Sequence, residues 1–273
     1  MTTAPANLKA VRKLMLDHLD IHEDSTKYPN DLDPAEVGIV GDTAHVKEGN
    51  SYHLGLPEQS KTGYAATESA RDKAGLCAYA SALDIGYFSV VVKGKTHTLR
   101  TFSAWLVNEC KAGASDTKDI REVIYSLDGK IVKRWDRLGK RSSGDSSHTF
   151  HTHISFFRDA TKAGRDLTSV FKRYLITVGL LSGPAPVVTH PAPTPKPPKG
   201  LPVYALGKRQ LKKGMRGTDV WDLQRRLNAK GAKLTADGDF GPKTDSAVRS
   251  FQRSHKLSVD GIAGPKTIAA LKK

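Results

Sequence analysis

Cysteine, aromatic residues and long apolar runs are all scarce in this sequence. Cys77 and Cys110 are the only cysteines among 273 residues, and no Cys-x-x-Cys motif occurs. Two cysteines are too few for a disulfide framework, so we interpret them as buried or idle thiols. No stretch of about 18 apolar residues is present, which excludes a membrane-spanning helix. With 38% hydrophobic and 7% aromatic residues, the chain can still build a packed core.

The N-terminal residues 1–24 also lack the features of a secretory signal. Acidic residues interrupt them early, and they contain no apolar region of the kind that a signal peptide requires. We therefore expect synthesis in a cytoplasm without a signal peptide. A target outside that cytoplasm must then be reached by a route other than general export.

Positive charge is in excess and is unevenly distributed. The chain carries 43 Lys and Arg against 28 Asp and Glu, a net charge of +15. Residues 201–273 contain 16 basic and 6 acidic residues, whereas residues 1–182 contain 25 and 22. We expect the C-terminal part to bind an anionic partner, which could be a nucleic acid, a membrane surface or an acidic wall polymer.

A proline-rich segment, residues 183–200, separates two differently patterned parts of the chain. Its prolines cannot donate backbone hydrogen bonds and favour an extended path, which is typical of a semi-rigid spacer. We predict one domain over residues 1–182, a linker over 183–200 and a second domain over 201–273.

The first of these domains shows a mixed pattern of helical periodicity and strand-like runs. The turn signal Asp128-Gly129 between two such runs predicts a β-hairpin. We predict an α+β fold with a small antiparallel sheet. Helices are expected at residues 7–19, in part of 65–82 and at 165–181, and strands at residues 87–92, 122–126, 131–135 and 151–157.

An internal repeat dominates the C-terminal part. The sequence DGDFGPKT at residues 237–244 recurs as DGIAGPKT at 260–267, and an apolar helical stretch follows each copy. A further helix is expected upstream, with Thr218 as its N-cap and Gly231 as its C-terminal stop. These features predict a small all-α domain of three helices.

Three histidines within six residues are the strongest chemical signal. In the sequence HTFHTH they are His148, His151 and His153. On a strand, the period of two places His151 and His153 on the same face. Two such imidazoles can share a metal, or one can bind metal while the other transfers protons.

A catalytic zinc site needs three protein ligands and one open position, so two more ligands are required besides His153. His53 stands in SYHLG and Asp84 in SALDIG. An unpaired aspartate in the small, apolar surroundings of Asp84 would be costly, and a metal would offset that cost. The alternative for Asp84 is a helix-end or turn cap.

The combination of SYHLG, SALDIG and HTFHTH resembles the zinc peptidases of the D-Ala-D-Ala carboxypeptidase and lysostaphin group. That resemblance implies that His53, Asp84 and His153 bind Zn²⁺ and that His151 is the catalytic base. His148 is similar to an additional histidine of penicillin-insensitive murein endopeptidases, which implies an auxiliary catalytic role. The wider pattern over residues 40–160 resembles the catalytic domain of endolysins from phages of actinobacteria.

The spacing departs from that group, because 30 residues separate His53 from Asp84. Asp72 is therefore a rival for the carboxylate ligand. Arg71 and Ser51 are candidates for contacting carboxylates of a substrate, and a surface salt bridge is the alternative for Arg71.

Residues 201–273 resemble the three-helix peptidoglycan-binding domain of the "PG-binding 1" type, through MRGTDVWDLQRRLNAKG and the two DGxxGPKT turns. Five apolar residues are expected to form its core: Leu223, Leu227, Val248, Phe251 and Leu271.

Together the resemblances imply an endolysin-like zinc metallopeptidase. It would hydrolyse amide bonds in peptide stems or cross-links of bacterial peptidoglycan and so cause cell-wall lysis. A D-Ala-D-Ala carboxypeptidase and a non-catalytic wall-binding protein are the alternatives, and nucleic-acid binding is favoured by charge alone. We expect a monomer that binds peptidoglycan and acts at the cell wall, with neither nucleic-acid binding nor membrane insertion. The bond that is cut stays open among L-Ala–D-Glu, D-Ala–D-Ala and cross-bridge bonds.

Overall fold

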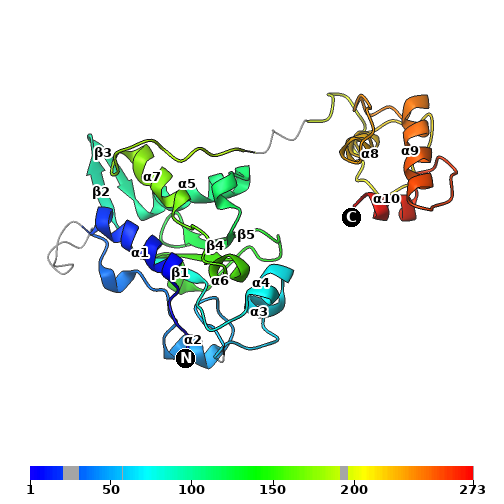
Figure 1. Ribbon diagram of the computed structural model, residues 1–273. Coiled ribbons are helices and arrows are strands. Elements are labelled where there is room, and N and C mark those ends of the chain that lie inside the picture. Colours follow the sequence, from blue (N-terminus) through cyan, green and yellow to red (C-terminus); the bar gives the residue numbers. More distant parts are fainter. Residues whose placement is uncertain (21–30, 57, 191–195, 273) are drawn as a thin grey trace. The chain divides into compact units, whose positions relative to one another are not determined.

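The computed structural model describes residues 1–20, 31–56, 58–190 and 196–272. It consists of two units, Met1–Ala192 and Pro193–Lys273 (Figure 1). The division between them falls inside the segment predicted as a linker, of which residues 191–195 lie outside the described residues. Each unit has its own hydrophobic core.

The N-terminal unit is built on a four-stranded antiparallel sheet in the order β1-β6-β4-β5, next to a separate β2-β3 hairpin. Its strands are β1 (Ala82–Ile85), β2 (Ser89–Val92), β3 (Lys95–Thr98), β4 (Ile120–Ser126), β5 (Val132–Asp136) and β6 (Thr152–Phe156). Its α-helices are α1 (Ala6–Leu19), α2 (Thr43–Glu48), α3 (Tyr64–Thr67), α4 (Ala70–Gly75), α5 (Leu99–Ala112), α6 (Arg158–Lys162) and α7 (Ser169–Val178). Short 3₁₀ helices occur at Pro34–Glu36, Ser115–Thr117 and Ser146–Thr149.

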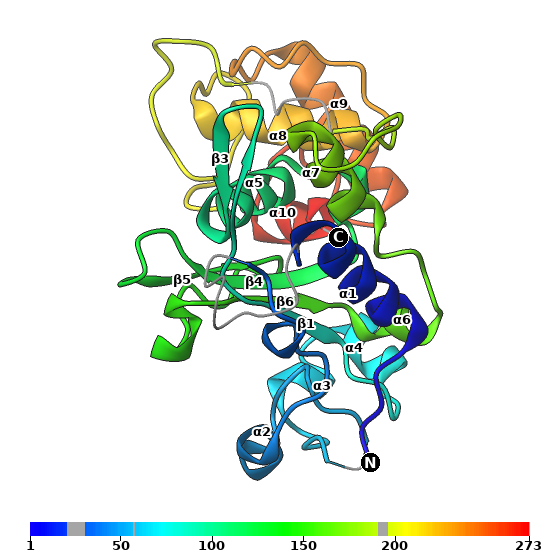
Figure 2. The same cartoon turned by 90° about the vertical axis from the view of Figure 1, so that its left-hand side faces the viewer.

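The two faces of the sheet have different chemistry. Leu83, Val123 and Ile154 lie on the face that packs against α1, α5 and α7 and belong to the main core. Figure 2 shows these three helices on one side of the sheet, with α2 and α3 on the other. Because side chains alternate along a strand, Asp84 and His153 point away from that core. The polar face of the sheet thus carries two of the predicted site residues, Asp84 and His153.

The predicted α+β class with a small antiparallel sheet is confirmed. The hairpin of β4 and β5 pairs Ser126 with Val132 around the Asp128-Gly129 turn. The expected helical character of residues 65–82 is limited to the two short helices α3 and α4. The chain leaves the helical conformation at Leu76 and enters β1 at Ala82.

The C-terminal unit is all-helical, as predicted, with α8 (Thr218–Ala229), α9 (Pro242–Ser254) and α10 (Pro265–Leu271). The GPKT sequences place a proline in the first turn of α9 and of α10, where its missing N–H has no intrahelical partner to lose. All five residues predicted for its core are buried: Leu223, Leu227, Val248, Phe251 and Leu271.

The predicted N-cap of α8 is wrong. Gly217 occupies the cap position, and Thr218 is already the first helical residue. The Thr218 hydroxyl is engaged elsewhere, because it accepts from the Tyr204 N–H at 2.8 Å and donates to the Tyr204 carbonyl at 2.9 Å. At the other end, Gly231 follows the C-cap with φ of 94°, a conformation suited to glycine and typical of a helix stop.

Across the described ranges, none of the helices combines the length and the apolar character needed to cross a membrane.

Close packing of α4 on α6 generates a first prediction. Gly75 is buried at the end of α4, and a Cβ there would collide with the backbone of Arg158 and Asp159. Gly75→Ala should therefore lower the free energy of unfolding by about 1–3 kcal/mol. Denaturant unfolding measures the change, with Lys73→Ala on the exposed side of α4 as control. Equal stability of the two variants would contradict this packing.

Candidate metal centre

Three of the predicted site residues converge on the polar face of the sheet. Asp84 in β1 and His153 in β6 are directly opposed partners of an antiparallel pair. His53 lies on the loop after α2, which is held near β1 by a hydrogen bond from the Ser81 N–H to the Tyr52 carbonyl at 2.6 Å. The chain thus brings together residues that are up to 100 positions apart.

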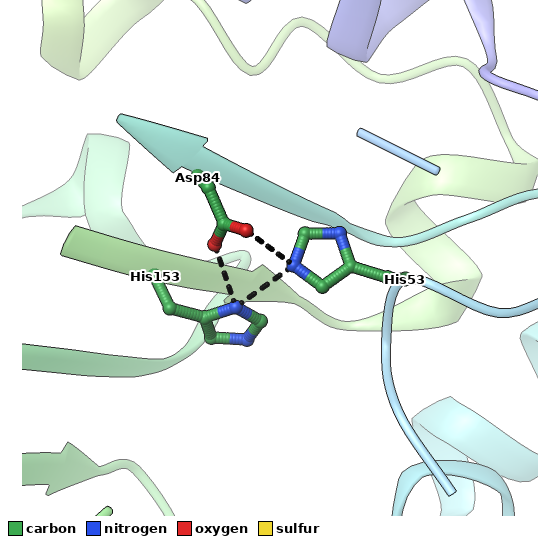
Figure 3. A group of neighbouring side chains, drawn as sticks. All are labelled: His53, Asp84 and His153. Carbon is green, nitrogen blue, oxygen red and sulfur yellow. Dashed lines mark hydrogen bonds and ion pairs between the residues drawn. The ribbon is translucent and has the colours of Figure 1, made fainter. Parts of the chain in front are cut away.

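The three side chains form a tight triangle (Figure 3). His53 Nε2 lies 3.0 Å from His153 Nδ1 and 3.1 Å from one oxygen of Asp84. The other oxygen of Asp84 lies 3.0 Å from His153 Nδ1. His53 is 2% exposed and Asp84 has a 23% exposed side chain, so the group is buried but reaches solvent at the carboxylate. One ligand atom from each residue is available within 4.8 Å of the others, as a metal site requires.

Hydrogen bonds on the outer side fix which imidazole nitrogens face inward as acceptors. His53 Nδ1 lies 2.8 Å from the Ile39 carbonyl, which can only accept, so Nδ1 carries the proton. His153 Nε2 lies 2.7 Å from the Ser155 hydroxyl, which itself donates to Glu122 at 3.2 Å. In their neutral forms both histidines therefore direct a lone pair toward the carboxylate of Asp84.

Four acceptor atoms at such short range repel one another unless a cation lies among them. Burial lowers the pKa of His53, but the charge and hydrogen bond of Asp84 outweigh it and raise that pKa above its ordinary value. Burial prevails at His153 and lowers its pKa to about 4. Burial also raises the pKa of Asp84, yet the charge of His53 and the hydrogen bonds from both histidines hold it well below its usual range. The group is thus built to stabilise one positive charge beside an ionised carboxylate.

The other two predicted histidines lie beside this triangle rather than in it. His151 directly precedes β6, and its Nε2 is 3.9 Å from the nearer Asp84 oxygen. Its ring lies 4.6 Å from that of His148, measured between centroids. Burial lowers the pKa of His151, so its imidazole is neutral at neutral pH. His148 is also buried, with Nδ1 3.3 Å from a carboxylate oxygen of Asp145.

Asp72, the rival carboxylate, lies outside the triangle. It is fully buried near the start of α4 and accepts hydrogen bonds from the Tyr52 hydroxyl at 2.9 Å and the Ser69 hydroxyl at 2.6 Å. Its second oxygen accepts from the backbone N–H of Arg158 at 3.3 Å. Through these hydrogen bonds Asp72 links the loop that carries His53 to helix α6.

Arg71 and Ser51 also have structural partners. Arg71 pairs with Asp119 and Asp159, which agrees with the salt-bridge alternative. The Ser51 hydroxyl accepts from the His53 N–H at 3.2 Å and so helps to orient the loop that carries His53. Both cysteines are free thiols, and burial raises the pKa of Cys110 to about 12.

Sequence reasoning missed Ser155, Glu122 and His45. Ser155 hydrogen-bonds His153 Nε2 and in turn donates to Glu122, so both residues help to orient the imidazole. The His45 ring lies 5.1 Å from that of His53, measured between centroids. Ser155 follows His153 by two residues on the same strand and so shares its face, which is the signal that could have found it. Glu122 is one of several polar residues of β4 and has no such signal. No corresponding signal marks His45 on the short helix α2.

One family model matches part of the C-terminal unit. Residues 216–271 match the family described as "Putative peptidoglycan binding domain". The chain is therefore a peptidoglycan-related protein with a function at the cell wall. Comparison with curated proteins gives no match.

Several solved structures are similar to part of the chain. An endolysin of the Burkholderia AP3 phage is 50% identical over 23% of this chain and 25% of its own, with a TM-score of 0.23. A fused Zn-dependent amidase/peptidase/peptidoglycan-binding domain-containing protein from Clostridium acetobutylicum is 43% identical over 24% and 29%, with a TM-score of 0.24. The SleB N-terminal domain is 40% identical over 25% and 94%, with a TM-score of 0.24. The chain thus spans less than a third of the first two proteins.

The hydrogen-bonded chain from His153 through Ser155 to Glu122 generates a second prediction. Ser155→Ala removes the acceptor that keeps the His153 proton on Nε2, so Zn²⁺ affinity should fall by about 10- to 100-fold. Competition with a chromophoric chelator measures that affinity, and Ser143→Ala on an exposed loop is the matched control. Unchanged affinity of Ser155→Ala would show that this hydroxyl does not position the imidazole.

Proposed function

We propose that the N-terminal unit is a zinc-dependent, endolysin-like peptidase that hydrolyses amide bonds in the peptide part of peptidoglycan. The observation that carries the proposal is the convergence of His53, Asp84 and His153 with their acceptor atoms directed at one point. The peptidoglycan-binding match of residues 216–271 supports the choice of substrate, because it attaches the same chain to the wall.

The donor set fits zinc. Two imidazole nitrogens and one carboxylate are ligands that zinc accepts, and three protein ligands leave a position open for chemistry. The second nitrogen of each histidine is held by a hydrogen bond, as metal-ligating histidines usually are. When bound, zinc supplies a Lewis acid that polarises the scissile carbonyl and makes water acidic.

His151 is the group placed to move protons. Its Nε2 lies next to the carboxylate of Asp84 but outside the ligand triangle, so it can accept a proton from water beside the centre. The same nitrogen can then donate that proton to the leaving amine. His148 lies against the His151 ring and orients it.

Phe150 adds an exposed apolar surface beside His151. It is 64% exposed, and its ring lies 5.3 Å from that of His151. A peptide stem lying across the centre would cover this ring.

Four variants separate ligands from the base. His153→Ala removes a donor atom, and Asp84→Asn replaces the anionic donor by a neutral amide oxygen, so zinc and hydrolysis should both be lost. His151→Ala leaves the donors intact, so zinc should stay bound while hydrolysis falls by about 10²- to 10⁴-fold. Asp72→Asn should keep zinc. Zinc stoichiometry by elemental analysis, with mass spectrometry of released wall fragments, reports both properties and identifies the bond cut. Loss of zinc from Asp72→Asn with retention in Asp84→Asn would reverse the assignment.

The two units should have separable roles, since each has its own core. Removing residues 201–273 should leave cleavage of soluble stem peptides intact and slow the solubilisation of intact walls, because the tether raises local concentration. Parallel assays on soluble peptides and on purified walls measure the two effects. Equal loss in both assays would show that the C-terminal unit serves folding or catalysis instead of wall attachment.

A further inference from the structure

A buried glutamine organises each of the two repeated turns in the C-terminal unit. Gln224 Nε2 donates to the Asp237 carboxylate at 2.8 Å and to the Thr244 hydroxyl at 3.1 Å. Its carbonyl accepts from the Gly238 N–H at 2.9 Å. We call this set of hydrogen bonds around one glutamine a frame. Gln224 is 1% exposed, so the frame lies in the interior of the unit.

The second repeat has the same frame. Gln252 Nε2 donates to the Asp260 carboxylate at 2.7 Å and to the Thr267 hydroxyl at 3.2 Å. Its carbonyl accepts from the Gly261 N–H at 3.0 Å, and Gln252 is also 1% exposed. The repeat in sequence is therefore a repeat in three-dimensional geometry.

Each frame forms the wall of a surface pocket. The pocket at the first turn has a volume of about 400 Å³ and that at the second about 330 Å³. Equivalent positions of the two repeats line them: Leu234 and Leu257, Thr235 and Ser258, Pro242 and Pro265, and Lys243 and Lys266. The C-terminal unit thus contains two pockets that are lined by equivalent residues of the two repeats.

The paired residues define what the pockets can bind. Lys243 and Lys266 are both exposed, and neither forms an ion pair with the residues described in 196–272. Each can therefore attract a carboxylate at the pocket edge. Asp237 and Asp260 use one carboxylate oxygen in the turn, which leaves the other to accept an N–H from a ligand. A short peptide with a free carboxylate supplies both groups.

We propose that the two pockets are separate binding sites for the carboxylate-bearing peptide stems of peptidoglycan, so that one chain holds two stems. This inference deepens the proposed wall-attachment role and rests on it, but it does not depend on hydrolysis. Two sites on a single unit bind a polymer with repeated stems more tightly than either site alone. Asp239 in the first pocket corresponds to Ile262 in the second, so the two pockets differ in charge at that position.

Residue-resolved amide NMR of the full chain tests the proposal with the metal chelated, so that no peptide is cut. The probe is the mixture of stem peptides released from purified peptidoglycan. Amide signals of residues 237–244 and 260–267 should both shift. Lys243→Gln should weaken binding about fivefold at the first turn only, and Lys266→Gln should do so at the second only. Signals at the candidate metal centre do not interfere, because each site is followed by its own amides.

Two matched variants control for loss of charge. Lys212→Gln removes an exposed lysine outside both pockets, and Lys230→Gln removes one from a neighbouring hollow that Lys243 also borders. Neither should change binding at the two turns. Shifts at one turn only, shifts with peptide-free glycan strands in place of stem peptides, or an effect of Lys230→Gln equal to that of Lys243→Gln would overturn the proposal. Wall binding without any shift at the turns would refute the two pockets and leave wall attachment standing.

Discussion

The pairing of β1 with β6 is the constraint on which the candidate centre depends. It sets Asp84 directly opposite His153 on the face of the sheet away from the core. The loop after α2 then places His53, the third residue of the group, beside them. The hydrophobic core behind β1 and β6 holds that register, since a slip of either strand by one residue would turn the site residue of that strand into the core. The result is a buried group of acceptors whose negative charge a proton on His53 or a bound metal ion would balance.

The local sequence predicted α1, α7 and the strands β2, β4, β5 and β6, but it predicted neither the long helix α5 nor the strand β1 that carries Asp84. It also could not decide between the two aspartates. Asp72 and Asp84 are both plausible ligands by spacing. The structure shows that Asp72 follows the N-cap Ser69 by three residues and exchanges hydrogen bonds with it, a capping pattern that is visible in the sequence SARD. Asp84 lies in a strand between the buried residues Leu83 and Ile85, and its carboxylate oxygens contact His53 and His153. Metal binding by Asp84 stays a prediction.

Contacts distant along the chain were beyond the reach of sequence patterns. Glu122 supports His153 through Ser155 across two strands, and Arg158 donates to the carbonyls of Ser51 and Ala65 from α6. These residues are recognisable only once the sheet order is known. The opposite holds for the C-terminal unit, where the local DGxxGPKT repeat predicted α9 and α10 and the segment upstream of it predicted α8.

In the proposed function, the N-terminal unit hydrolyses amide bonds and the pockets of the C-terminal unit bind the wall polymer. The claim most directly open to measurement is that zinc lies among His53, Asp84 and His153. Crystals of the full chain loaded with one equivalent of zinc, measured at the zinc absorption edge, should show one anomalous peak in contact with His53 Nε2, His153 Nδ1 and the Asp84 carboxylate. A peak on His45, His148 or Asp72 instead, or no peak in protein that still hydrolyses walls, would contradict the account.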